Sequence, residues 1–151
     1  MYLSTFFDIS PIFPMPGSGN YMRQPLFVED FCNIIINCID MKKDNKIYNI
    51  TGKEKLLLIN LLKKIAKEKK KKILFIKIPL PIFHMMIKVY GLFNRKTKIV
   101  PDQLTALTAG DVFPVIAWER KFNVISTKFD DGIRKTINSR YYRYSSKMTR
   151  E

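Results

Sequence analysis

A glycine turn that leads into an arginine is the stretch of this sequence best suited to binding chemistry. Gly17, Gly19 and Asn20 come just before Arg23 in the segment Gly-Ser-Gly-Asn-Tyr-Met-Arg. Glycine adopts positive φ angles freely and leaves room for a ligand to approach the backbone. A guanidinium group binds the paired oxygens of a phosphate or a carboxylate through two parallel hydrogen bonds. The segment predicts a ligand-binding edge, with Arg23 as the contact to an anionic group and the other three residues shaping its rim.

Two acidic residues nearby leave alternatives open. Glu29 is close enough in sequence to pair with Arg23, which would make that arginine a structural residue. Asp30 falls where a helix is expected to begin, and a carboxylate there accepts free backbone N–H groups of the first turn. We therefore expect Asp30 to cap a helix rather than to contact a ligand.

The elements that must position this segment follow from hydrophobic periodicity. Pro25–Val28 has the aromatic and β-branched bias of a short strand. From Asp30 to about Met41 the apolar residues recur every three or four positions, which predicts an amphipathic helix. Its apolar stripe consists of Phe31, Ile34, Ile35, Cys38 and Ile39.

The rest of the chain alternates between short strands and helices. We expect strands at Ile47–Ile50 and Ile73–Ile78. Thr51 and Glu54 have the spacing of a capping box that opens a helix to about Lys69, and Thr127 and Asp130 repeat the spacing near the C-terminus. The apolar stripe of the first of these helices is Leu58, Leu61, Leu62 and Ile65. With further helices near Pro81 and over residues 101–109, the pattern gives three strands and four to five helices, a mixed α/β chain.

Four motifs in a fixed order resemble one protein family. The segment Gly-x-Gly-x-x-x-Arg-Gln-Pro-Leu-Phe-Val-Glu-Asp, from Gly17 to Asp30, is followed by Tyr-Asn-Ile-Thr-Gly at residues 48–52. Asp-Gln-Leu at 102–104 and Phe-Asp-Asp-Gly-Ile-Arg-Lys-Thr at 129–136 come later. Together they resemble the C-terminal half of the extended short-chain dehydrogenase/reductases, the NAD-dependent nucleotide-sugar epimerases and dehydratases. The resemblance covers residues 14–137.

The resemblance implies a fold and a division of the chain. Residues 1–140 would be the C-terminal, substrate-binding part of a Rossmann-type fold, an α+β fragment whose N-terminal NAD(P)-binding part is missing. Residues 141–151 would be a basic tail. Met1–Pro16 would be an internal segment that lines the substrate pocket in relatives. Arg23 matches the arginine that contacts the diphosphate of the nucleotide-sugar.

The motifs that the family needs for hydride transfer are not recognisable in this sequence. No glycine-rich loop follows a strand, and neither Tyr48 nor Tyr90 has a lysine four residues later, as the Tyr-x-x-x-Lys pair of the family requires. We therefore expect no catalytic, cofactor-binding or metal-binding residues on this chain. NAD(P) is implied by the family, with its binding residues elsewhere. The expected partners are a nucleotide-sugar or another phosphorylated small molecule, and a missing N-terminal half or a second copy.

The strong positive charge raises another function class. The sequence has 27 Lys+Arg and 13 Asp+Glu, a formal net charge of +14. Such an excess suits a polyanion-binding module, with the lysines of Lys67–Lys72 and the tyrosines and arginines of the tail as its contacts. No aromatic residue interrupts the lysine run to stack on bases. We therefore interpret the run as a solvated helix end and do not expect a nucleic-acid partner.

A helix that is apolar on nearly every side raises a third class. Ile82–Phe93 needs cover on several faces, and a short chain has little to offer. The longer apolar region Ile73–Phe93 is not a membrane span, because Pro79 and Pro81 interrupt it and Lys77 and Lys88 fall within it. An exposed patch here would suit peripheral membrane contact, in a non-catalytic accessory subunit of a membrane-associated complex such as respiratory complex I.

The remaining reactive side chains suggest no site. His84 is the one histidine, and it lacks neighbours suited to metal binding or acid–base work. Cys32 and Cys38 are expected to be buried free thiols in a reducing compartment. No signal peptide is recognisable, since no basic region precedes the apolar residues at the start. These features favour a cytoplasmic location.

Overall fold

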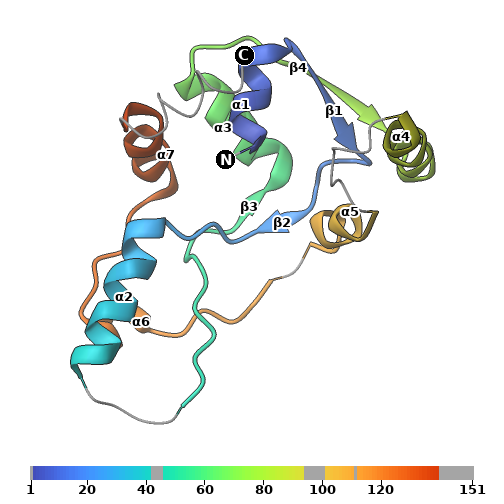
Figure 1. Cartoon of the computed structure of the whole chain (residues 1–151). Helices are drawn as coiled ribbons and strands as arrows, with labels where there is room; N and C mark the ends of the chain where they lie inside the picture. Colours follow the sequence, from blue (N-terminus) through green and yellow to red (C-terminus); the bar gives the residue numbers. More distant parts are fainter. Residues whose placement is uncertain (1, 42–45, 94–100, 111, 140–151) are drawn as a thin grey trace.

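The computed structural model describes residues 2–41, 46–93, 101–110 and 112–139. In these ranges the chain forms seven helices and four short strands (Figure 1). The helices are α1 Tyr2–Ile9, α2 Val28–Asp40, α3 Leu58–Glu68, α4 Leu80–Phe93, α5 Pro101–Thr108, α6 Trp118–Phe122 and α7 Phe129–Asn138. The strands are β1 Ile12–Pro16, β2 Met22–Arg23, β3 Leu56–Leu57 and β4 Leu74–Ile78.

The strands form two small sheets. β1 and β4 pair in parallel, in a register that runs from Ile12 opposite Leu74 to Pro16 opposite Ile78. β2 and β3 pair antiparallel, with Arg23 opposite Leu56. A parallel pair needs a long crossover, and α2, β2, β3 and α3 all lie within it. The mixed α/β class expected from the sequence is confirmed.

The main core lies between α1, the β1–β4 sheet and α3. Phe7 and Phe13 meet edge to face with their ring centroids 5.5 Å apart, an arrangement that aromatic quadrupoles favour. Met15 and Leu62 are completely buried beside them. The buried members of this core are Phe7, Phe13, Met15, Leu58, Leu62, Ile65 and Ala66. The apolar stripe predicted for α3 thus faces the core, with Leu61 at its margin.

A second, smaller core joins α2 to α6. Ile34 packs with Trp118, Phe122 and Val124, all buried. The indole N–H of Trp118 donates to the carbonyl of Thr51 at 3.0 Å. A buried indole needs such an acceptor, so this bond fixes the extended segment around Thr51 against α6.

Several predicted elements are wrong. Pro25–Val28 is not a strand: α2 begins at Val28, and the preceding residues are an extended link that joins no sheet. Ile47–Ile50 is not a strand either, and it packs Tyr48 and Ile50 on the second core instead. The expected strand at Ile73–Ile78 is confirmed as β4. The prediction of four to five helices is too low, because the described residues also form α1 and α6, for which no helix was predicted.

The predicted helix caps are wrong as well. α3 begins at Leu58 without a side-chain cap, so Thr51 and Glu54 do not open it. Glu54 instead accepts a hydrogen bond of 2.7 Å from the backbone N–H of Phe129, the first residue of α7. Carboxylates suit helix N-termini whether they come from nearby or from far along the chain. The capping chemistry is present but acts between distant segments.

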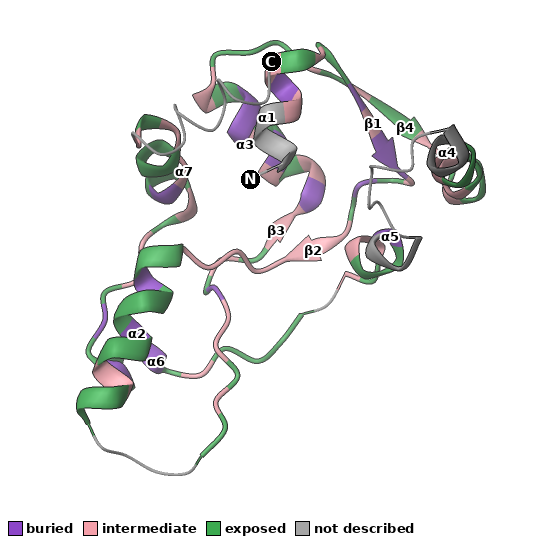
Figure 2. Ribbon diagram, in the orientation of Figure 1, coloured by how far each residue is buried: buried purple, intermediate pink, exposed green. Residues whose placement is uncertain are grey.

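The prediction of a poorly covered apolar helix is confirmed for the described side chains of α4. Residues 81–89 include no buried side chain. Ile82, Met85, Met86 and Val89 follow helical spacing and expose 48%, 62%, 46% and 47% of their surface. Figure 2 shows α4 as a mostly exposed helix at the margin of the molecule.

Candidate functional site

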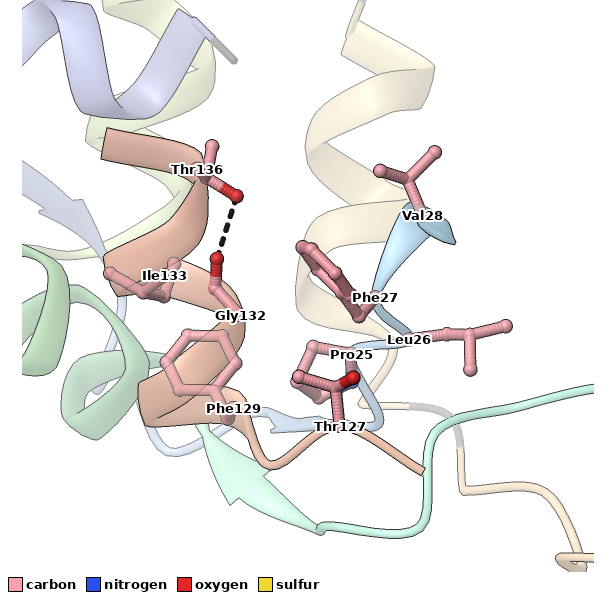
Figure 3. A pocket seen from close by; sticks show the side chains of 9 residues that line it. All are labelled: Pro25, Leu26, Phe27, Val28, Thr127, Phe129, Gly132, Ile133 and Thr136. Atoms are coloured by element: carbon pink, nitrogen blue, oxygen red, sulfur yellow. Dashed lines mark hydrogen bonds between the residues drawn. The ribbon is translucent and has the colours of Figure 1, made fainter. Parts of the chain in front are cut away.

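A small groove lies between the link that precedes α2 and one face of α7. Its cavity volume is about 220 Å³. The ring of Phe27 points into the space in front of α7 (Figure 3). Pro25, Leu26, Phe27, Val28, Thr127, Phe129, Gly132, Ile133 and Thr136 line it. We call it the Phe27 groove.

Gly132 allows Phe27 to lie close to α7. A Cβ atom at Gly132 would come within 3.0 Å of Cδ2 of Phe27. The ring also lies 5.4 Å from the ammonium nitrogen of Lys135, one turn further along α7. Lys135 is in turn 3.9 Å from the carboxylate of Glu29. The groove thus has an apolar floor and a charged pair at its margin.

Asp30 holds the end of the groove where α7 begins. Its carboxylate accepts the backbone N–H and the hydroxyl of Thr127, both at 2.7 Å. Asp30 exposes only 4% of its surface, and α2 has no side-chain cap. The predicted capping role is therefore wrong. Asp30 joins α2 to the residues before α7, and the sequence spacing of Thr127 and Asp130 does not form a cap.

The polar groups of the groove are engaged within the protein. The hydroxyl of Thr136 donates to the carbonyl of Gly132 at 2.8 Å (Figure 3), and the hydroxyl of Thr127 is bound to Asp30. The groove therefore offers apolar surface to a ligand and suits a flat or aliphatic group better than a phosphate.

Arg23 is half-buried, and its guanidinium group meets the end of α5. The Nη2 group donates to the carbonyls of Ala106, at 2.9 Å, and Leu107. The Nη1 group donates to the carbonyl of Met22 at 3.3 Å. A cation at a helix C-terminus satisfies free carbonyls and meets the negative end of the helix dipole. The pairing of Arg23 with Glu29 is not what the structure has, because Glu29 pairs with Lys135.

The two glycines of the binding motif make the turn between β1 and β2. Gly17 and Gly19 have φ angles of +59° and +73°, so the expectation of positive φ is confirmed. The carbonyl of Gly19 accepts the backbone N–H of Ile59 at 3.0 Å. This bond ties the turn to the first residues of α3. Asn20 is exposed, and its backbone N–H donates to the hydroxyl of Ser18 at 3.2 Å.

The predicted site residues Gly17, Gly19, Asn20 and Arg23 lie within seven positions of one another in the sequence, but none of them lines the Phe27 groove. Arg23 stands two residues before Pro25, where the groove wall begins. Sequence reasoning missed Phe27, Gly132 and Thr136. A glycine within a helical pattern was the available signal, since it costs helix stability unless something packs closely against it.

A second hollow of about 300 Å³ lies at the end of α6. It is lined by Glu119, Arg120, Asn123, Val124 and Ile125. Glu119 pairs with Lys53 and accepts the backbone N–H of Ser126 at 3.1 Å. The hydrogen bond from Lys53 is the largest cause that lowers the pKa of Glu119. Glu119 thus links α6 to Lys53 and to the backbone at Ser126.

The described residues hold no cluster of three or more His, Cys, Asp or Glu side chains that could bind a metal ion. His84 lies half-buried on α4. Cys32 and Cys38 are both free, but Cys32 is exposed and Cys38 is only half-buried, so the prediction of two buried thiols is wrong. In the described ranges no helix combines the length and the apolar character needed to span a bilayer.

Comparison with solved structures finds a distant structural likeness. No protein-family model and no curated protein matches this sequence. Among solved structures, the chain is similar to UDP-glucuronic acid 4-epimerase from Bacillus cereus, which was crystallised in complex with NAD. The TM-score is 0.44 at 14% sequence identity, and the alignment covers 89% of this chain. The chain spans 36% of the length of that epimerase.

Proposed function

We propose that this chain is the substrate-binding portion of an NAD-dependent epimerase/dehydratase-like protein, not catalytic alone, and that it binds a nucleoside-diphosphate sugar. The observation that carries the proposal is the order of the motif from Gly17 to Asp30. Its residues form one continuous path from the end of β1, through β2, to the first turn of α2. On this path Arg23 comes two residues before the segment that forms one wall of the Phe27 groove.

Arg23 and the Phe27 groove suit different parts of a nucleoside-diphosphate sugar. Arg23 lies at the end of α5 with a planar cation able to meet phosphate oxygens through the N–H groups that are not bound to Met22, Ala106 or Leu107. The Phe27 groove begins two residues later and offers an aromatic ring to a flat or aliphatic group. We assign the diphosphate to Arg23 and the rim to Gly17, Gly19 and Asn20.

The described residues do not fit the NAD(P) that such chemistry uses. Dinucleotides bind where a glycine turn leads from a strand directly into a helix, whose N-terminus faces the pyrophosphate. Here the glycine turn leads from β1 into β2 instead. We therefore propose that the cofactor is held by another polypeptide or another part of the protein, and we derive no step of hydride transfer from these residues.

Calorimetric titration with UDP-sugars and GDP-sugars tests the proposal. The chain should bind a nucleoside-diphosphate sugar with saturation, and Arg23→Gln should weaken binding at least about tenfold, the effect of one lost charged hydrogen bond. Arg134→Gln is the matched control, because Arg134 is exposed and its ion pairs in the described part of the chain, with Glu68 and Asp131, lie at the surface. Since Arg23 also holds α5, thermal unfolding must show that Arg23→Gln is folded at the titration temperature. Equal affinity of the two variants would refute the role of Arg23.

The exposed stripe of α4 favours a second candidate, a non-catalytic accessory subunit that binds a membrane surface. Ile82, Met85, Met86 and Val89 form an apolar stripe, and Lys88 is exposed beside it. Apolar burial combined with attraction of a chain of charge +14 to anionic lipids would support such binding. Flotation with phosphatidylserine vesicles should recover the protein, and Met85→Glu should abolish recovery. No recovery on anionic vesicles at low salt would refute this candidate.

A further inference from the structure

The two strands of the parallel sheet have very different outer edges. The N–H of Leu74 donates to the carbonyl of Pro11 at 2.8 Å, and that of Gly17 donates to the carbonyl of Ile78 at 2.7 Å. With the parallel register, these bonds fix which residues face the partner strand. Leu74, Ile76 and Ile78 turn both backbone groups toward β1, so Phe75 and Lys77 turn theirs away.

The outer edge of β1 is closed. Pro14 and Pro16 occupy two of its three outward positions and have no N–H group. At the third position, the N–H of Ile12 donates to the hydroxyl of Ser10 at 3.1 Å, and that hydroxyl donates back to the carbonyl of Ile12 at 2.8 Å. Proteins use such prolines and local bonds to prevent strand pairing at an edge.

The outer edge of β4 is open. Among the described residues β4 pairs with β1 alone, in a sheet of two strands. Because alternate residues of β4 face β1 in this register, the outward N–H and C=O groups of Phe75 and Lys77 have no strand partner among the described residues. Leu74 and Ile76, on the face that does not meet the core, expose 61% and 44% of their surface. Parallel sheets are ordinarily covered on both faces and have more than two strands, so this pair can accept a further strand.

Lysines surround the open edge. Lys70, Lys71 and Lys72 are exposed directly before β4, and Lys77 is exposed within it. Lys69 differs, because it is largely buried in an ion pair of 2.6 Å with Asp8. A second copy of the chain paired along this edge would bring like charges together, which destabilises strand pairing. An acidic strand would find opposite charge at both ends of β4.

We propose that the outer edge of β4 binds an extended acidic segment of a partner protein, which adds to the sheet as a third strand. Backbone hydrogen bonds to Phe75 and Lys77 supply the pairing, as in other cases of strand addition. Carboxylates on the segment meet Lys70–Lys72 and Lys77, and its apolar residues extend the exposed face of Leu74 and Ile76. The proposal does not depend on nucleotide-sugar binding.

A fluorescein-labelled peptide of about ten residues with alternating Glu and Val, the length of a long strand, is the probe. Fluorescence anisotropy should show that it binds, while its Lys-Val counterpart does not. Amide hydrogen exchange should show that Phe75 and Lys77 exchange rapidly in the free chain and become protected when the Glu-Val peptide is added. Lys77→Pro removes an outward N–H but none of the groups that pair with β1, and should weaken binding about tenfold.

Lys77→Val is the matched control, because it keeps the outward N–H and removes only the charge. It should retain more affinity than Lys77→Pro, with the protection of Phe75 unchanged. Unchanged binding by Lys77→Pro would overturn the proposal. So would protection of both amides in the free monomer, equal binding of the Lys-Val peptide, or concentration-dependent self-association through the same amides, which would assign the edge to a second copy.

Discussion

The carboxylate of Asp30 accepts both the backbone N–H and the hydroxyl of Thr127, each at 2.7 Å, although 97 positions separate the two residues. Glu54 binds the backbone N–H of Phe129 two residues later. Two acidic residues from the first half of the chain thus hold the start of α7. The groove between Phe27 and α7 depends on both of them.

Replacing Asp30 with alanine should destabilise the protein by about 2–3 kcal/mol. The substitution leaves a partly buried N–H and a hydroxyl of Thr127 without their acceptor. Hydrogen bonds to a charged group contribute more to stability than bonds between neutral groups. Urea unfolding followed by circular dichroism measures the effect. Asp40→Ala is the control, because Asp40 is exposed at the end of the same helix and should change stability by less than about 0.5 kcal/mol. Equal effects of the two substitutions would contradict the structural role of Asp30.

Replacing Glu54 with alanine should loosen the first turn of α7 at a cost of about 1 kcal/mol, the usual value of an N-terminal cap. Hydrogen exchange should quicken at the amide of Phe129 and leave the amides of α3 unchanged. Glu29→Ala serves as the control, since Glu29 is exposed and its pair with Lys135 is long, at 3.9 Å. If exchange quickened in α3 instead, Glu54 would belong to the capping box expected from the sequence.

These two carboxylates show where sequence reasoning succeeds and where it stops. Periodicity located α2, α3 and β4 because apolar stripes are a local property that burial requires. Thr51 and Glu54, and Thr127 and Asp130, have capping spacing, but Glu54 binds the N–H of Phe129, 75 positions away, and Thr127 binds Asp30, 97 positions away. Spacing along the chain carries no information about such distant partners.

The candidate site was predictable to a similar extent. Positive φ at Gly17 and Gly19 followed from residue type, and the structure has it. The position of Arg23 against the carbonyls of α5 did not, because the sequence gives no sign that residues 106 and 107 come near residue 23. The Phe27 groove needs the same kind of long-range information, since its two walls lie about a hundred residues apart.

Acid should weaken the contact between Lys53 and Glu119. The pKa of Glu119 is lowered from its ordinary value of 4.5, chiefly by the hydrogen bond from Lys53. The unfolded chain therefore takes up a proton at this group at a higher pH than the folded chain. The stabilisation is fully present above pH 4.5 and is lost as the pH falls through the lower folded pKa. Thermal unfolding of the protein and of Glu119→Gln across this acidic range should show a smaller loss of stability in the variant, and parallel curves would contradict the assignment.

Alanine substitutions at Gly19 and Gly110 should distinguish the cost of a positive φ angle from the cost of steric crowding of the new side chain. Gly19 and Gly110 have nearly the same φ angles, +73° and +68°, so alanine carries a similar conformational cost of about 1–2 kcal/mol at both. Their surroundings differ. A Cβ atom at Gly19 would lie 3.0 Å from the side chain of Met15 and 3.3 Å from that of Ile59, whereas at Gly110 the nearest atom of the described residues is the backbone N of Met22, 3.6 Å away. Because Met15 is fully buried and cannot move freely, Gly19→Ala should lose more stability than Gly110→Ala by about 1–3 kcal/mol, the range for an overpacked core. Urea midpoints of the two variants measure the difference. If both lost the same amount, the turn would owe its glycine to φ alone, and close packing against β1 and α3 would not constrain this position.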